Sequence, residues 1–225
     1  MKKFELSGNT LKFIGALSMF LDHMGFILFP DIIFFRIIGR LAFPIFAFMI
    51  SEGCRYTKNI LRYFFTVLIC GILFQLAYYI ATGQTDMNIF ITFSISIALI
   101  ISLKYFSQTE QSPFAALGVI ILLCGVFILN SLFEIDYGVL GSIAPVFSLL
   151  TQTRDDEHIK RVMMFSVGLL ILCVAYGGIQ YYSLLAIPLL LSYNGKRGKL
   201  KLKYFFYIFY PTHLMLLQGI YILIA

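Results

Sequence analysis

The sequence predicts an all-α protein, a polytopic bundle of about nine helices that span a membrane. Of the 225 residues, 60% are hydrophobic and only 12% are charged, which leaves more apolar surface than a soluble domain of this length can cover. The apolar residues form runs close to the roughly 20 residues that a helix needs to cross a bilayer. These runs are continuous and do not alternate with polar residues, which favours helices over the strands of a barrel.

Each apolar run is expected to form one span. The first run contains charged residues and has no small-residue cleavage site, so we expect it to stay in place and act as its own insertion signal. The sixth and eighth runs are interrupted by Pro145 and Pro188. We expect a single transmembrane domain over residues 1–225, whose spans are 11–29, 32–50, 60–81, 89–106, 114–132, 134–151, 162–177, 179–193 and 204–224.

The basic residues predict the orientation of these spans. Of the 17 Lys and Arg residues, 15 fall on one side of a nine-span arrangement, and the other two lie within the second run. Cytoplasmic loops of membrane proteins carry an excess of Lys and Arg, so the amino terminus is expected in the cytoplasm and the carboxyl terminus outside a bacterial-type cell membrane. The 15 residues are Lys2, Lys3, Lys12, Arg55, Lys58, Arg62, Lys104, Arg154, Lys160, Arg161, Lys196, Arg197, Lys199, Lys201 and Lys203.

Composition also limits the partners. The formal charge of +6 does not indicate a nucleic-acid partner, because the basic residues lie in short loops between apolar runs. The basic run at 196–203 favours contact with anionic membrane lipids. No metal site is expected, and no Cys-x-x-Cys pair occurs, so reduced thiols are expected at Cys54, Cys70, Cys124 and Cys173.

The first two runs carry charges where a membrane tolerates few. Asp22 and His23 lie well inside the first run, and Arg36 and Arg40 lie four residues apart on one face of the second. An isolated ionised group at the centre of a bilayer costs roughly 2.5–3.5 kcal/mol, so such groups usually face the bundle interior and pair. These four residues therefore predict a buried polar site between adjacent helices.

The predicted topology places this site in the outer half of the membrane. Lys12 then lies near the cytoplasmic mouth, about 16 Å along the first helix from His23. Pro44 removes the amide that would bond the Arg40 carbonyl, so a bend is expected there. A second interruption is expected at Pro211, one turn from His213. Asn88 and Thr92 open the fourth span from outside, and Asp136, Tyr137 and Gly138 open the sixth.

Each signal also has a structural interpretation, which the sequence leaves open. A single intramembrane histidine is often only a hydrogen-bond partner between helices, which applies to His23 and to His213. Arg36 and Arg40 would then only neutralise Asp22 and Asp136 and hold the bundle together. On this view Asp136 is an interfacial carboxylate.

Several motifs resemble known families. Lys12 and His23 are separated by ten residues, as in the basic-x10-His pattern on the first helix of type-three membrane acyltransferases. A more extensive resemblance, in matching order over nearly the whole chain, is to the TraX family of conjugation-linked pilin acetylases. It rests on Gly39-Arg40-Leu-Ala-Phe-Pro-Ile-Phe-Ala-Phe, Glu52-Gly53, Asn88-Ile-Phe-Ile-Thr92, Asp136-Tyr137-Gly138 with Gly141, and Tyr210-Pro211-Thr-His213.

The resemblance implies acyl transfer, usually of acetyl, from cytoplasmic acyl-CoA to an acceptor at the outer face. The acceptor would be an amine or hydroxyl of a peptide, pilin or glycan, and acetyl-CoA would be a co-substrate with no permanently bound cofactor. His23 would be the general base, Asp22 or a neighbouring carboxylate would orient or tune it, and Arg40 or Arg36 would stabilise the oxyanion. The donor phosphates would bind Lys12, Arg55, Lys58 and Arg62. Acceptor binding would fall to Asn88, Thr92, Asp136, Tyr137 and His213.

A proton-coupled transporter or proton relay is the rival interpretation, because lines of His, Asp and Arg side chains also carry protons through membranes. The sequence shows no inverted repeat, which counts mildly against a transporter. A purely structural membrane partner is the third possibility.

Overall fold

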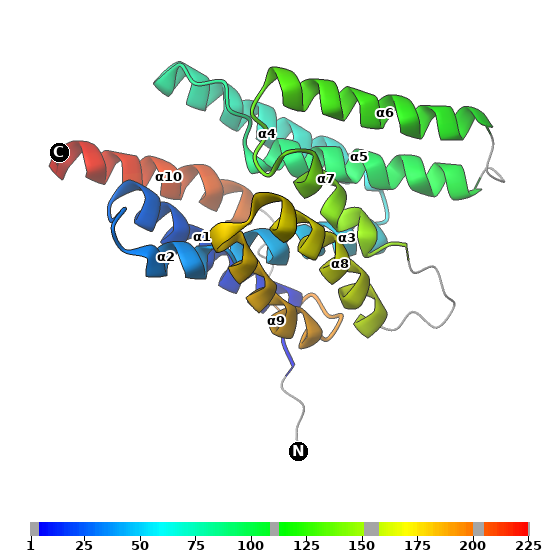
Figure 1. Ribbon diagram of the computed structural model, residues 1–225, viewed down its shortest axis with the longest axis horizontal. Helices are drawn as coiled ribbons and strands as arrows, with labels where there is room; N and C mark the ends of the chain where they lie inside the picture. Colours follow the sequence, from blue (N-terminus) through cyan, green and yellow to red (C-terminus); the bar gives the residue numbers. More distant parts are fainter. Residues whose placement is uncertain (1–4, 109–112, 151–157, 200–204, 225) are drawn as a thin grey trace. The chain divides into compact units, whose positions relative to one another are not determined.

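In a computed structural model, the regular structure is helical throughout the described residues, apart from two isolated β-bridges (Figure 1). The described residues are 5–108, 113–150, 158–199 and 205–224. Five of the basic residues that predicted the topology lie outside these ranges, namely Lys2, Lys3, Arg154, Lys201 and Lys203. The helices are α1 (Gly8–Ile27), α2 (Ile33–Gly39), α3 (Ala42–Tyr56), α4 (Ile60–Thr82), α5 (Ile89–Gln108), α6 (Pro113–Leu132), α7 (Gly138–Phe147), α8 (His158–Tyr176), the 3-10 helix η1 (Gly178–Ala186), α9 (Ile187–Leu191) and α10 (Phe205–Ile224).

The chain forms two compact units, which are described separately. The first unit comprises Met1–Met49 and Asp155–Ala225, and the second comprises Ile50–Arg154. In the first unit α1 packs on α2 and α10, while η1 packs on α2, α8 and α9. In the second unit α5 packs on α4, α6 and α7. The single domain expected over the whole chain remains a prediction.

The helices agree with the predicted apolar runs in most places. Within the part of the chain that the structure describes, five helical stretches are long and apolar enough to cross a membrane: Ile33–Tyr56, Ile60–Thr82, Ile89–Gln108, His158–Tyr176 and Phe205–Ile224. Shorter apolar helices cover Ala116–Leu132, Gly138–Phe147 and Gly178–Leu191. The sixth predicted run yields only the ten residues of α7, about 15 Å of helix, and the eighth changes from 3-10 to α-helix just before Pro188. The protein is therefore an all-helical protein with several candidate membrane spans.

The second predicted run is interrupted close to the expected place. Helix α2 ends at Gly39 and α3 begins at Ala42, so Arg40 lies in the break. Pro44 falls in the first turn of α3, where its missing amide removes no hydrogen bond of that helix. The interruption predicted at Pro211 is wrong, because α10 continues through this proline. A single lost backbone bond is tolerated inside many membrane helices.

Close helix contact brings α1 and α2 together. A Cβ atom on Gly25 would lie 2.6 Å from the Cβ of Phe35, and one on Gly39 would overlap the side chain of Asp22. Neither position can hold a larger residue without moving the partner helix. The two glycines thus set the short distance at which Asp22 meets the second helix.

The amino-terminal end of α1 is held by the loop after α9. Ser7 caps the helix by accepting from the Thr10 amide at 3.2 Å. The Gly8 amide donates to the Lys196 carbonyl at 2.8 Å, and Leu6 forms a parallel bridge with Tyr193. Segments at residues 5–9 and 192–197 therefore lie side by side in the first unit.

Two loops pair in a similar way in the second unit. The Met87 amide donates to the Glu134 carbonyl at 2.7 Å, and the Asp136 amide donates to the Met87 carbonyl at 2.9 Å. Tyr137 has a positive φ of 57° and Gly138 one of 54°, which turns the chain sharply into α7. This turn brings the start of α5 beside the start of α7.

Candidate functional site

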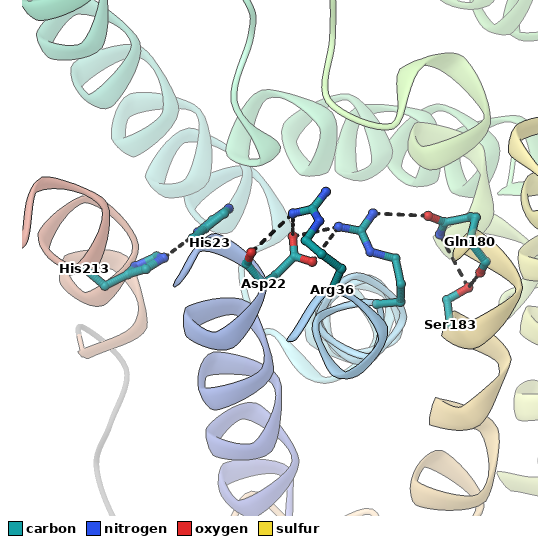
Figure 2. A network of polar contacts seen from close by, with 7 residues as sticks. Asp22, His23, Arg36, Gln180, Ser183 and His213 are labelled. Atoms are coloured by element: carbon teal, nitrogen blue, oxygen red, sulfur yellow. Dashed lines mark hydrogen bonds and ion pairs between the residues drawn. The ribbon is translucent and has the colours of Figure 1, made fainter. Parts of the chain in front are cut away.

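The carboxylate of Asp22 is held between two guanidinium groups in the first unit (Figure 2). Arg36 Nη1 donates to Asp22 Oδ2 at 2.8 Å and to the Asp22 backbone carbonyl at 3.3 Å. Arg40 Nη2 contacts both carboxylate oxygens, at 2.6 and 2.7 Å. Side-chain exposure is 12% for Asp22 and Arg40 and 26% for Arg36. The cluster carries one excess positive charge when all three groups are ionised.

Further polar groups extend the cluster from Arg40 toward η1. Arg40 Nη1 donates to Gln180 Oε1 at 3.4 Å, and Gln180 Nε2 donates to Ser183 Oγ at 3.4 Å (Figure 2). The Ser183 hydroxyl in turn donates to the Gln180 backbone carbonyl at 2.6 Å, and the Cys173 thiol lies 3.2 Å from the same hydroxyl. Ser183 thereby fixes the Gln180 amide with its oxygen toward Arg40.

His23 points toward α10 and not toward its neighbour Asp22. His23 Nδ1 lies 2.7 Å from His213 Nε2, and His213 Nδ1 lies 2.7 Å from the Phe209 carbonyl oxygen. The two imidazole rings are nearly parallel, with centroids 4.9 Å apart, and Figure 2 shows them facing one another between α1 and α10. His213 is buried, whereas His23 is half-buried.

This geometry changes the expected relations between site residues. Asp22 was expected to orient or tune His23, but its side chain binds Arg36 and Arg40, and His213 contacts His23 in its place. His213 was expected among the acceptor-binding residues. Its direct contact with His23 places it beside the predicted base.

The residues predicted to bind donor phosphates are divided between the two units. Lys12 belongs to the first unit, is half-buried, and has its Nζ 5.9 Å from the centroid of the Phe206 ring. Arg55, Lys58 and Arg62 belong to the second unit, where Arg55 lies over the Tyr56 ring. Lys58 and Arg62 are exposed. Their role toward the donor stays a prediction.

The other predicted acceptor residues gather in the second unit and have structural partners there. Asn88 Nδ2 donates to the Gly71 carbonyl and to Gln75 Oε1, both at 3.0 Å, which ties α5 to α4. The Thr92 hydroxyl donates to the Asp136 carbonyl at 2.6 Å. Asn88 and Thr92 are buried, Tyr137 is half-buried and Asp136 is exposed.

Three residues of the site were missed by reasoning from the sequence. Gln180, Ser183 and Cys173 come from the seventh and eighth apolar runs, and all three are buried. Two polar side chains spaced three residues apart within an apolar run were the available signal for Gln180 and Ser183. No sequence signal indicates the Phe209 carbonyl, because every residue carries one.

The arrangement supplies two groups that acyl transfer requires. A neutral imidazole that is partly accessible can accept a proton from a nucleophile during reaction. The cluster of Asp22, Arg36 and Arg40 carries one excess positive charge next to His23 in sequence, and a guanidinium can stabilise developing negative charge.

Comparisons with known proteins agree with the resemblance seen in the sequence. The family model described as TraX protein matches residues 7–221. The chain is 26% identical over 249 residues to the probable fimbrial assembly protein FimC, serogroup H1, of Dichelobacter nodosus, covering 96% of each chain. It is 29% identical over 151 residues to an uncharacterized protein of Rickettsia prowazekii, covering 64% of this chain and 55% of that one. No solved structure matches the chain significantly. Since the family model covers nearly its whole length, the chain belongs to the TraX protein family.

Proposed function

We propose that this chain is a multi-pass membrane acyltransferase of the bacterial-type cell membrane. It moves an acyl group, with acetyl as the expected group, from cytoplasmic acyl-CoA to an amine or hydroxyl acceptor at the outer face. The acceptor is a peptide or pilin amino terminus or a glycan. The observation that carries the proposal is the half-buried His23 placed directly beside a buried Asp22 that binds Arg36 and Arg40.

In the proposed reaction these groups act in sequence. His23 takes the proton of the acceptor nucleophile as that atom attacks the thioester carbonyl. The carbonyl oxygen becomes an oxyanion, which a guanidinium stabilises. When the intermediate collapses, the carbon–sulfur bond breaks and the coenzyme A thiolate takes the proton from His23. The acceptor leaves acylated, free coenzyme A is released, and His23 returns to its neutral form.

Arg36 is the better placed of the two arginines to meet the oxyanion. Its side chain is 26% exposed against 12% for Arg40, and its Nη2 has no hydrogen-bond partner among the described residues. Arg40 instead directs Nη2 at both oxygens of Asp22 and Nη1 at Gln180. Asp22 is then a positioning residue that holds the two arginines.

The expected topology places donor and acceptor on opposite sides of the membrane. Two loop pairings support it, because Leu6 bridges Tyr193 and Met87 bridges Ile135. The first pair joins two segments expected in the cytoplasm, and the second joins two segments expected outside. The nine-span arrangement, with the amino terminus in the cytoplasm and the carboxyl terminus outside, therefore remains our proposal.

A proton relay is less well supported by the described contacts. From His23 the line of hydrogen bonds passes through His213 and ends at the Phe209 carbonyl, which is an acceptor only. A transporter would show flux that depends on a pH gradient. An acyltransferase would consume thioester.

The test is transfer of label from acetyl-CoA in membranes that contain the protein. His23→Ala should lose about 10²–10⁴-fold in rate and Arg36→Gln about 10²–10³-fold, with both proteins still inserted and still binding acyl-CoA. Arg36→Lys should restore only part of the rate, because an ammonium lacks the planar fork of a guanidinium. Near wild-type transfer by well-inserted His23→Gln would show that His23 serves only as a hydrogen-bond partner.

A further inference from the structure

The hydrogen bonds around His213 determine where its hydrogen lies. His213 Nδ1 is 2.7 Å from the Phe209 carbonyl oxygen, one turn earlier in α10. A carbonyl oxygen can only accept, so Nδ1 of His213 carries a hydrogen. Neutral imidazole carries one hydrogen, and Nε2 of His213 therefore presents a lone pair.

That lone pair fixes the hydrogen of the second imidazole. His23 Nδ1 lies 2.7 Å from His213 Nε2, so His23 Nδ1 has to be the donor. Nε2 of neutral His23 is then unprotonated. Among the described residues this atom has no hydrogen-bond partner, and His23 is only half-buried.

We propose that His213 is a positioning residue that holds neutral His23 in its Nδ1–H tautomer, so that Nε2 of His23 is the proton acceptor in acyl transfer. The second half of this inference rests on the proposed function. The first half rests on geometry alone and can be tested without activity.

Aromatic contacts hold both rings in the required planes. His213 stacks on Phe209 with centroids 4.8 Å apart and planes at 14°, and it is 3% exposed. The Tyr210 ring lies nearly perpendicular to both imidazoles, with its centroid 6.3 Å from that of His23 and 5.8 Å from that of His213. Rotation of either ring would break the line of hydrogen bonds.

The same arrangement stabilises the charged form that the reaction creates. When His23 accepts a proton at Nε2, both of its nitrogens carry hydrogens, and Nδ1–H stays bonded to His213 as a charge-assisted hydrogen bond. The proton then leaves from Nε2 to the thiolate. His213 keeps its own hydrogen throughout, so its role is orientation and not proton transfer.

Nitrogen NMR on the full-length protein in nanodiscs tests the tautomer directly. The chain has three histidines, so ¹⁵N-histidine labelling gives six ring nitrogens, assigned by replacing one histidine at a time. At a pH where the imidazoles are neutral, His23 is expected to show a protonated Nδ1 and an unprotonated Nε2. A protonated Nε2 on His23 in the wild-type protein would overturn the proposal.

Two substitutions at His213 separate orientation from packing. His213→Gln supplies an acceptor oxygen and should keep the His23 tautomer, whereas His213→Phe keeps the stacking ring and should give a mixture of tautomers. His158→Phe is the matched control and should leave the His23 signals unchanged. Transfer should fall about 10- to 100-fold in His213→Phe, the range seen for groups that orient metal-bound histidines, and less in His213→Gln.

The outcomes also separate this inference from the proposed function. A role in packing alone would give the reverse order, with His213→Phe faster than His213→Gln, and would overturn the inference. The Nδ1–H tautomer in a protein that consumes no thioester would support the orientation and contradict acyl transfer. Active protein with the opposite tautomer would contradict the orientation alone.

Discussion

Asp22 contributes to the site by binding the two arginines, and this role determines how much folding stability is lost when Asp22 is substituted. Removing one partner of a buried ion pair typically costs about 3–5 kcal/mol, because the remaining charge loses its compensation. Asp22→Asn leaves two guanidinium groups facing a neutral amide. We expect a loss of folding stability in this range, measured as the shift of the unfolding transition in detergent.

Arg36→Gln is the matched comparison for Asp22→Asn. Arg40 still contacts both oxygens of Asp22 in that variant, and Arg36 is the more exposed of the two arginines. The loss of stability should therefore be clearly smaller than for Asp22→Asn, while the loss of transfer should be large. Equal destabilisation by both changes would show that Arg36 shares the structural role of Arg40.

At the level of helices, the small size of Gly39 decides whether the cluster can form. A Cβ atom at this position would overlap the Asp22 side chain, so Gly39→Ala must displace either α1 or α2. Gly39→Ala should therefore lower both stability and transfer.

A Cβ on Gly219 of α10 meets nothing within 4 Å, which makes Gly219→Ala the control. That change should be neutral or stabilise by up to about 1 kcal/mol, as Ala does relative to Gly in a helix. Tolerance of Gly39→Ala in both assays would contradict the close approach of α1 and α2.

The helices were largely predictable, but the partners of their side chains were not. The run at 60–81 forms α4, Ile60–Thr82. A long apolar run preceded by the cap residue Asn59 and followed by Gly83 strongly favours a helix with these ends. The pairing of Asp22 with Arg36 and Arg40 was anticipated, since unpaired charge is costly in a bilayer. Asp136, which only the structural interpretation pairs with the arginines, belongs to the second unit. Which ring His23 would face depends on the rotation of α1 against α10, and apolar periodicity does not report that rotation.

For the whole molecule, substitutions can test whether Lys12 binds the donor phosphates independently of the basic residues of the second unit. The loop that holds the start of α1 brings the Lys196 and Arg197 carbonyls onto the Gly8 and Asn9 amides, which places further basic residues near that helix end. If Lys12 binds donor phosphate, Lys12→Gln should raise the donor KM about tenfold and change kcat little, because such contacts are uniform binding. The comparison variants are Arg55→Gln and Arg62→Gln, each alone and combined with Lys12→Gln. In all of these variants the KM for the acceptor should hardly change. An unchanged donor KM in the Lys12→Gln, Arg55→Gln double variant would remove both residues from the donor site.

The orientation of the chain can be tested with single cysteines. After Cys54, Cys70, Cys124 and Cys173 are changed to Ala, one cysteine is introduced at an exposed position and labelled with a membrane-impermeant maleimide. Tyr181, which is 45% exposed in η1, is expected outside because α8 runs outward before it in the nine-span arrangement. Lys58 is exposed between α3 and α4 and is expected in the cytoplasm. Tyr181→Cys should therefore label in intact cells, and Lys58→Cys only after the membrane is opened. Labelling of Tyr181→Cys from the cytoplasm alone would reverse the side at which the acceptor meets the site, and with it the assignment of donor and acceptor to opposite faces.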